Sequence, residues 1–136
     1  MDFPTLTILM IKGEYKRILW EIFDVLNFFE PEKEEALEGF KRKFANQLLM
    51  EIRGCLSDEQ RDWIAGVAIE KKYDKNDPNV TEIQRVIDSA YPKEKMGQTS
   101  KMVFKKILAS YVGFMSQKIS TEKSEKLNQI LNNFKT

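Results

Sequence analysis

The sequence predicts an all-α fold, a compact bundle of five to seven amphipathic helices that forms a single domain over residues 1–136. Apolar residues recur at spacings of three and four along most of the chain, which is the period of a helix with one buried face. Prolines and capping residues divide these runs into pieces of helical length. At 136 residues, such a chain buries about two thirds of its unfolded surface, so we expect it to fold without a cofactor or a disulfide.

The N-terminal segment is the one place where apolar and polar residues alternate as in a strand. It reads TLTILMI over residues 5–11, and a strand there would have no partner within the chain. We therefore expect residues 1–13 to form a leading helix that bends or breaks at Gly13, with an N-terminal arm as the alternative.

The first two long helices are predicted from their apolar stripes. The first covers residues 15–29, with one apolar face made of Tyr15, Ile18, Leu19, Ile22, Phe23, Leu26 and Phe29. Pro31 is expected to end it. The second helix begins with acidic residues 32–35 and carries basic residues 41–43 later, an order that suits the helix dipole. Its stripe comprises Leu37, Phe40, Phe44, Leu48 and Ile52.

A third helix is predicted to start at Ser57, because Ser57 and Gln60 have the spacing of a capping box. The polar segment that follows it, residues 71–84, resembles a calcium-binding loop at first sight. Counted from Asp74, however, the twelfth position is Arg85, where such a loop needs a bidentate Glu, and the register that starts at Asp77 lacks the required glycine. We interpret the segment as a turn, with a second capping box at Thr81 and Gln84.

Three further helices complete the predicted bundle. A short one carries the apolar residues Val80, Ile83, Val86, Ile87 and Ala90. Residues 91–98 are expected to form a polar loop, after which Thr99 or Ser100 caps a fifth helix. Apolar residues cover more than half the circumference of this fifth helix, so we expect it to be central. The last helix begins at about Thr121 and buries Leu127, Ile130, Leu131 and Phe134.

The composition excludes several chemistries. The chain contains no histidine, which excludes Ser-His-Asp and Cys-His catalysis as well as the histidine-containing zinc and di-iron sites. The glycines are scattered singly, so no phosphate-binding loop is formed. Cys55 is more typical of a small core residue than of a reactive thiol. We predict no catalytic, cofactor-binding or metal-binding residues, and hence a protein that is not an enzyme.

The same features indicate a compartment. One cysteine cannot form an internal disulfide, and the first residues lack the pattern of a signal peptide. The apolar run of residues 3–11 is about half the length that a transmembrane helix needs. We expect a cytoplasmic protein with no membrane span.

Charge is balanced over the chain but not along it. The net charge is +1, yet residues 1–68 carry −4 and residues 69–136 carry +5. The densest basic stretch, residues 93–106, contains Lys93, Lys95, Lys101, Lys105 and Lys106. Lysines interleaved with Tyr91 and Phe104 could contact single-stranded nucleic acid. A solvated helix face is the alternative, since this stretch has no arginine for bidentate contacts.

Two aromatic residues of the first helix do not fit its apolar stripe. Trp20 and Phe28 project away from it, and Leu9 in the leading segment is a candidate to lie with them. Either the fold covers these residues or they form a protein interface.

We therefore predict a non-catalytic helical protein-interaction module that binds a protein partner or a second copy of itself. Two alternatives stay open. One is a nucleic-acid-binding protein that uses residues 93–106, and the other is a helical carrier of an apolar ligand, whose cavity the nine Phe and six Met residues could line.

Overall fold

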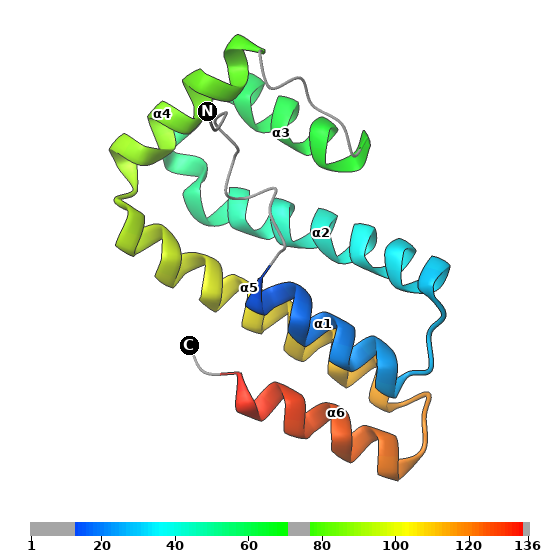
Figure 1. Cartoon of the computed structure of the whole chain (residues 1–136). Coiled ribbons are helices and arrows are strands. Elements are labelled where there is room, and N and C mark those ends of the chain that lie inside the picture. Colours follow the sequence, from blue (N-terminus) through cyan, green and yellow to red (C-terminus); the bar gives the residue numbers. More distant parts are fainter. Residues whose placement is uncertain (1–12, 71–76, 135–136) are drawn as a thin grey trace.

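The computed structural model describes residues 13–70 and 77–134. Within these ranges there are six α-helices, a single 3-10 turn and no strand, which confirms the predicted all-α bundle (Figure 1). The elements are α1 (Glu14–Val25), α2 (Glu30–Ile52), η2 (Arg53–Cys55), α3 (Asp58–Glu70), α4 (Pro78–Ala90), α5 (Lys93–Ser116) and α6 (Thr121–Asn133). The predicted leading helix, with Leu9, lies outside the described residues, and so does Asp74.

Four of the helices form the body of the bundle. Helix α5 packs against α2 and α6, and α1 packs against the same two helices. Helices α2 and α5 run antiparallel, and α3 and α4 lie together at the upper end of the view in Figure 1. Helix α3 packs on α2, while α4 contacts the 3-10 turn that ends α2.

The aromatic ring of Phe104 lies at the centre of this body. Phe104 belongs to α5 and is 0% exposed. Its ring stacks on Tyr15 of α1 at 4.2 Å between centroids, and Phe40 and Phe44 of α2 lie 5.3 and 6.2 Å away. Phe134, which caps the C-terminus of α6, completes the cluster at 5.3 Å. One side chain therefore joins all four helices, in agreement with the central position predicted for the fifth helix.

The turn after α1 is a Schellman motif. Asn27 has φ 61°, in the left-handed region. The N–H of Asn27 donates to the carbonyl of Asp24 and the N–H of Phe28 donates to the carbonyl of Phe23, both at 3.0 Å. The ring of Phe28 stacks on that of Phe23 at 5.6 Å between centroids, which is the apolar contact that usually accompanies this motif. The position of Phe28 off the helical stripe is thus explained by the helix end.

Helix α2 begins two residues before the predicted acidic start. The carboxylate of Glu32 accepts the backbone N–H of Phe29 at 2.9 Å, and Pro31 lies in the first turn, where no backbone N–H is required. Pro31 therefore starts a helix here, and the expectation that it ends the first one is wrong, since α1 already ends at Val25. Phe29 is 76% exposed, so it does not belong to the buried face of α1 as predicted.

An ion pair joins the end of α1 to the start of α2. The ammonium group of Lys33, which is largely buried, lies 2.5 Å from a carboxylate oxygen of Asp24 and 3.6 Å from one of Glu30. The hydrogen bond to Asp24 raises the pKa of Lys33 above its ordinary value. Lys33 of α2 thus connects the last turn of α1 with the first turn of its own helix.

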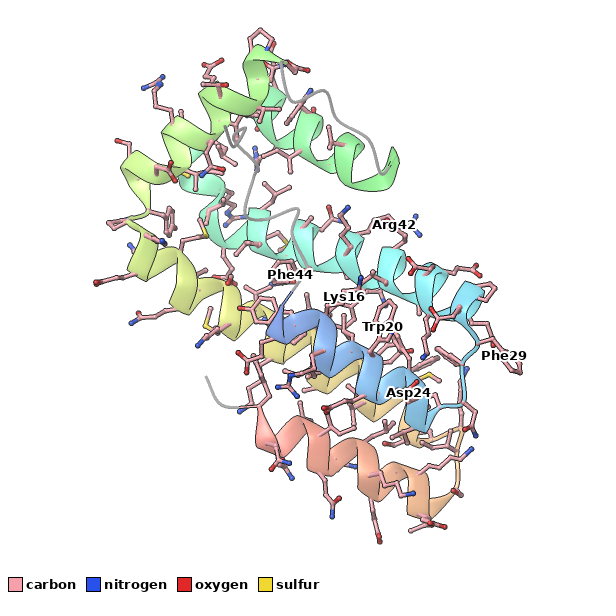
Figure 2. All side chains as sticks on the ribbon, viewed as in Figure 1. Lys16, Trp20, Asp24, Phe29, Arg42 and Phe44 are labelled. Atoms are coloured by element: carbon pink, nitrogen blue, oxygen red, sulfur yellow. The ribbon has the colours of Figure 1, made fainter. Side chains whose placement is uncertain are left out.

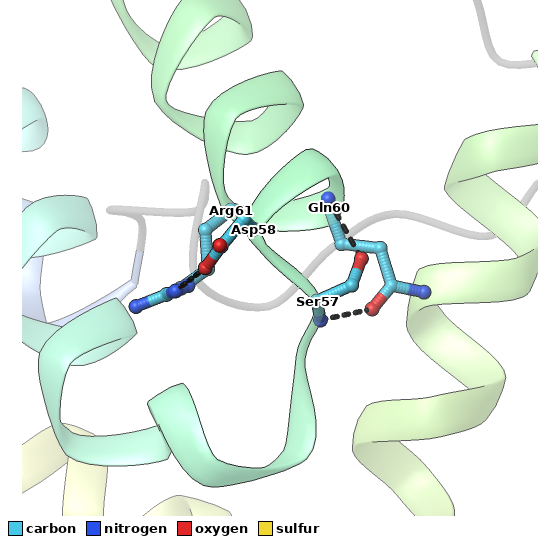
Figure 3. A network of polar contacts seen from close by, with 4 residues as sticks. All are labelled: Ser57, Asp58, Gln60 and Arg61. Atoms are coloured by element: carbon cyan, nitrogen blue, oxygen red, sulfur yellow. Dashed lines mark hydrogen bonds and ion pairs between the residues drawn. The ribbon is translucent and has the colours of Figure 1, made fainter.

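The predicted capping box at the start of α3 is confirmed (Figure 3). The N–H of Gln60 donates to Oγ of Ser57 at 3.2 Å, and the N–H of Ser57 donates to Oε1 of Gln60 at 2.8 Å. Asp58 and Arg61 form an ion pair on the adjacent turn. The capping residues alone were sufficient to locate this helix start.

The starts of α4 and α5 differ from the prediction. Asp77 caps α4 by accepting the N–H of Asn79 at 2.9 Å, so α4 starts ahead of the capping box expected at Thr81. Helix α5 starts at Lys93, directly after Pro92, and the polar loop expected over residues 91–98 is for the most part helical. The reason is that Met96 is buried against the core, while the polar residues around it form the solvent side of the same turns.

The last helix agrees with the prediction. Helix α6 starts at Thr121, and Oγ of Ser120 accepts the N–H of Lys123 at 3.3 Å. Leu127 and Phe134 are buried, and Ile130 and Leu131 pack against the core.

Replacing Phe104 with Ala should lower the free energy of unfolding by about 3–5 kcal/mol, because it leaves a cavity where four helices meet. The matched control is Phe114→Ala on the same helix. Phe114 is 56% exposed, so its loss should change stability by less than about 0.5 kcal/mol. Urea unfolding followed by circular dichroism measures both, and equal losses would contradict the central role of Phe104.

Replacing Asn27 tests the Schellman motif. Asn27→Val places a β-branched residue at positive φ and should cost about 1–2 kcal/mol of stability. Asn27→Gly should be neutral or stabilising by up to about 1 kcal/mol, since glycine adopts this conformation without steric strain. Thermal unfolding of the two variants checks the difference. If valine were tolerated as well as glycine, the turn would not have the geometry described.

Candidate functional site

The surface predicted around Trp20 is partly covered by the protein's own helices. Trp20 is half-buried, and its ring lies 5.6 Å from that of Phe23. The ammonium group of Lys16 lies 5.0 Å from the centroid of the indole. Figure 2 shows Lys16, Trp20 and Asp24 on successive turns of α1. Because Asp24 binds Lys33 of α2, this flank of α1 faces α2.

Trp20 and Phe28 are brought together by the structure through Phe23, which both rings contact. Both residues are half-buried. Leu9, the third member predicted for this surface, lies outside the described residues. An interface at Trp20 and Phe28 stays a prediction, and their contacts already have a structural explanation in the packing of α1.

The five predicted lysines all lie on α5, but they do not form one patch with the aromatic residues. At about 100° per residue, Lys106 is turned about 100° from Lys105 and about 140° from Lys101. Lys95 lies over the ring of Tyr91, with the ammonium group 4.8 Å from the ring centroid. Phe104 is fully buried, so its ring is not available to stack on a base. Lys93, at the first residue of α5, is exposed.

The described residues include a groove between α2 and α5, which the sequence did not predict. It has a volume of about 700 Å³. Twelve residues line it, and the seven from α2 are Ala36, Gly39, Phe40, Lys43, Asn46, Gln47 and Met50. The five from α5 are Lys106, Ile107, Ser110, Tyr111 and Phe114. On each helix these positions fall on one face, which is why two long helices can form a continuous groove.

The groove has an aromatic floor and exposed apolar ends. Phe40 is buried and Tyr111 is half-buried, and their ring centroids lie 6.2 Å apart. Met50 is 59% and Phe114 is 56% exposed. Because α2 and α5 are antiparallel (Figure 1) and both residues lie near the C-terminus of their helix, Met50 and Phe114 lie toward opposite ends. Together with the rings of Phe40 and Tyr111, these two side chains make the groove the candidate interaction surface of the described residues.

The lining of the groove is positively charged. Lys43 on α2 and Lys106 on α5 provide one ammonium group on each side, and none of the twelve lining residues is acidic. A third lysine, Lys118, places its ammonium group 4.3 Å from the centroid of the Phe114 ring. In a chain with 22 basic and 21 acidic residues, the groove is therefore a local excess of positive charge.

Two features of the described residues concern metal binding and nucleophilic chemistry. No group of three or more His, Cys, Asp or Glu side chains there is placed to hold a metal ion. Burial raises the pKa of the half-buried Cys55 thiol, which disfavours the reactive thiolate. Among the helices that the structure describes, none combines the length and the apolar character needed to cross a bilayer.

Comparison with known proteins gives no relative for this chain: no family model, no curated protein sequence and no solved structure matches it. The site is therefore interpreted from its geometry and chemistry alone.

The groove could have been anticipated from one sequence signal. The apolar residues of α5 extend around more than half its circumference, and Phe114 lies outside the arc that a single core can cover. Met50 is likewise off the predicted apolar stripe of α2. These two residues were the available signal, but the pairing of α2 with α5 could not be obtained from periodicity.

Four groups with a raised pKa should make the fold less stable at alkaline pH, and one of them is the Cys55 thiol described above. Burial raises the pKa of Tyr15 and of Tyr111, so the unfolded chain ionises first, and stability falls once the pH exceeds about 10. The pKa of Lys33 is also raised, mainly by Asp24, so its contribution is present below the ordinary lysine pKa and is lost as the pH rises through the raised value. We expect a lower urea midpoint at about pH 11 than at about pH 8.

The variant Tyr111→Phe checks the assignment. It removes one of the ionising groups, so the midpoint should fall less steeply with pH than in the wild-type protein. An equally steep fall would show that Tyr111 contributes nothing to the alkaline loss.

Proposed function

We propose that this protein is a non-catalytic helical protein-interaction module of the cytoplasm, and that its binding surface is the groove between α2 and α5. The observation that carries the proposal is the combination of an aromatic floor with two large apolar side chains, Met50 and Phe114, that are more than half exposed. Such residues at the edges of a concave surface are stabilised when a partner covers them.

The dimensions of the groove fit a helical partner. Its α2 side extends from Ala36 to Met50, about 21 Å or four helical turns at 1.5 Å per residue. Two neighbouring helices with a furrow between them form the usual receptor for the apolar face of a third helix. That third helix can belong to another protein or to a second copy of this one.

The alternative of an apolar-ligand carrier is less well supported. A volume of about 700 Å³ is within the range of small-molecule sites, but such sites bury most of the ligand's surface. Here the apolar side chains at the two ends are themselves exposed. Nucleic-acid binding has the weakest support of the three functions, because the lysines of α5 lie on different sides of the helix and Phe104 is buried.

The cytoplasmic part of the proposal rests on the cysteine content. The single cysteine, Cys55, is half-buried and forms no disulfide with any described residue. A chain that folds around an aromatic core without disulfides is suited to a reducing compartment.

A peptide-display selection tests the proposed function. A library of helix-forming peptides is selected on the wild-type protein, and we expect enrichment of sequences with apolar residues at i, i+3, i+4 and i+7. The enriched peptides should bind a Met50→Ser/Phe114→Ser double variant at least about tenfold more weakly, because exposed apolar anchors are removed. Absence of enrichment, or equal binding to the double variant, would contradict the proposal.

Two further variants complete the test: the first should block peptide binding by obstructing the groove, and the second is a control outside the groove. Gly39→Leu adds a side chain at a position where a Cβ meets nothing within 4 Å, so it should leave the fold intact or stabilise it by up to about 1 kcal/mol while it obstructs the groove. Phe29→Ser removes an aromatic ring that is more exposed than Phe114 but does not line the groove, and peptide binding should be unchanged.

A further inference from the structure

We infer that the groove selects an amphipathic helix whose apolar stripe is flanked by acidic residues on both sides. This inference rests on the proposed function and adds the chemistry of the partner. It is carried by the placement of charge around the groove rather than by its apolar lining.

The two lysines of the lining come from opposite sides. Lys43 belongs to α2 and Lys106 to α5, and both are exposed. Neither forms an ion pair with any residue that the structure describes. Each ammonium group is therefore able to pair with a carboxylate of the partner.

No lining residue opposes this charge. On α2, Glu32, Glu34 and Glu35 precede Ala36, where the lining begins, while Glu38 and Glu51 are neighbours of the lining residues Gly39 and Met50 but do not line the groove. The only acidic residue of α5 is Glu94, in its first turn. Lys118, over Phe114, adds a third ammonium group near one end. A cationic partner would meet like charge at Lys43 on one side of the groove and at Lys106 on the other, whereas an anionic one would meet opposite charge at both positions.

The geometry specifies where the carboxylates should lie. A helix that places its apolar stripe on Phe40, Ile107 and Tyr111 presents its flanking positions to α2 on one side and to α5 on the other. Acidic residues on one flank would reach Lys43 or Lys106 but not both. Acidic residues on both flanks can pair with both lysines, so the charge pattern also disfavours helices with a single acidic edge.

The preference should be sensitive to salt. Lys43 and Lys106 are at the rim, where ion pairs are screened and individually weak. Complementary rim charge affects the choice of partner and the rate of association more than it affects maximal affinity. The apolar contacts should therefore persist at high salt while the discrimination by charge declines.

The test uses three synthetic helical peptides with one apolar stripe and flanks of Glu, Gln or Lys. Fluorescence polarisation gives Kd for each at about 50 mM and about 500 mM salt. For the wild-type protein at low salt we expect the Glu-flanked peptide to bind at least about tenfold more tightly than the Lys-flanked one, with the Gln-flanked peptide between them. At high salt the difference should shrink.

The second part of the experiment reverses the charge of the two lysines that line the groove. The double variant Lys43→Glu/Lys106→Glu should prefer the Lys-flanked peptide. The matched control, Lys93→Glu/Lys101→Glu, changes the net charge by the same amount on exposed positions of α5 outside the groove, and it should keep the wild-type preference. Circular dichroism of each variant verifies that the helical content is retained.

The outcomes separate this inference from the proposed function. If all three peptides bind with the same Kd and Phe114→Ser still weakens them, the charge inference is overturned and the groove stands as a protein-binding site. If the control variant reverses the preference as strongly as the groove variant, the selection comes from net charge and the inference is overturned. Binding of dodecanoate in the groove with no binding of any peptide would overturn both.

Discussion

The packing of aromatic rings around Phe104 is the interaction on which the rest of this structure depends. The Phe104 ring contacts a residue from each of the other three helices of the body, and its stacking on Tyr15 is the closest of these contacts. The cluster extends through Phe40 to Tyr111, and from Tyr111 to Phe23 at 6.3 Å between centroids. A continuous series of rings therefore crosses the bundle from the end of α6 to the turn after α1, where Phe28 stacks on Phe23.

This arrangement makes the groove a consequence of the core. Phe40 and Tyr111 contact core rings and also line the groove. The groove therefore cannot widen or close without altering the packing on its inner side, and close-packed interiors resist such changes. A partner would meet a largely preformed surface, which reduces the conformational entropy lost on binding.

The sequence predicted local features well and long-range features poorly. The start of α3 was located because Ser57 and Gln60 satisfy each other's backbone donors, a relation that spans three residues. The apolar spacing of three and four residues predicted the fold class because it too is a relation between residues close together in the sequence. The helical character of residues 93–98 was missed because burial of Met96 depends on distant helices. The packing of Phe28 on Phe23 was not predicted because it depends on positive φ at Asn27. The groove was not predicted because it needs two helices that are far apart in sequence.

Lysine side chains lie over three of the accessible aromatic rings of this protein. Lys16 lies over Trp20, Lys95 over Tyr91 and Lys118 over Phe114. An exposed cation–π contact contributes only about 0.5–1 kcal/mol, so each lysine shields its ring from non-specific association and is still readily displaced. At Phe114 a partner must move Lys118 to reach the ring, and a carboxylate at the edge of that partner offers the displaced ammonium group a new ion pair. A partner without negative charge would lose the cation–π contact with no such compensation, so under the proposed function Lys118 would add to the selectivity for acidic partners.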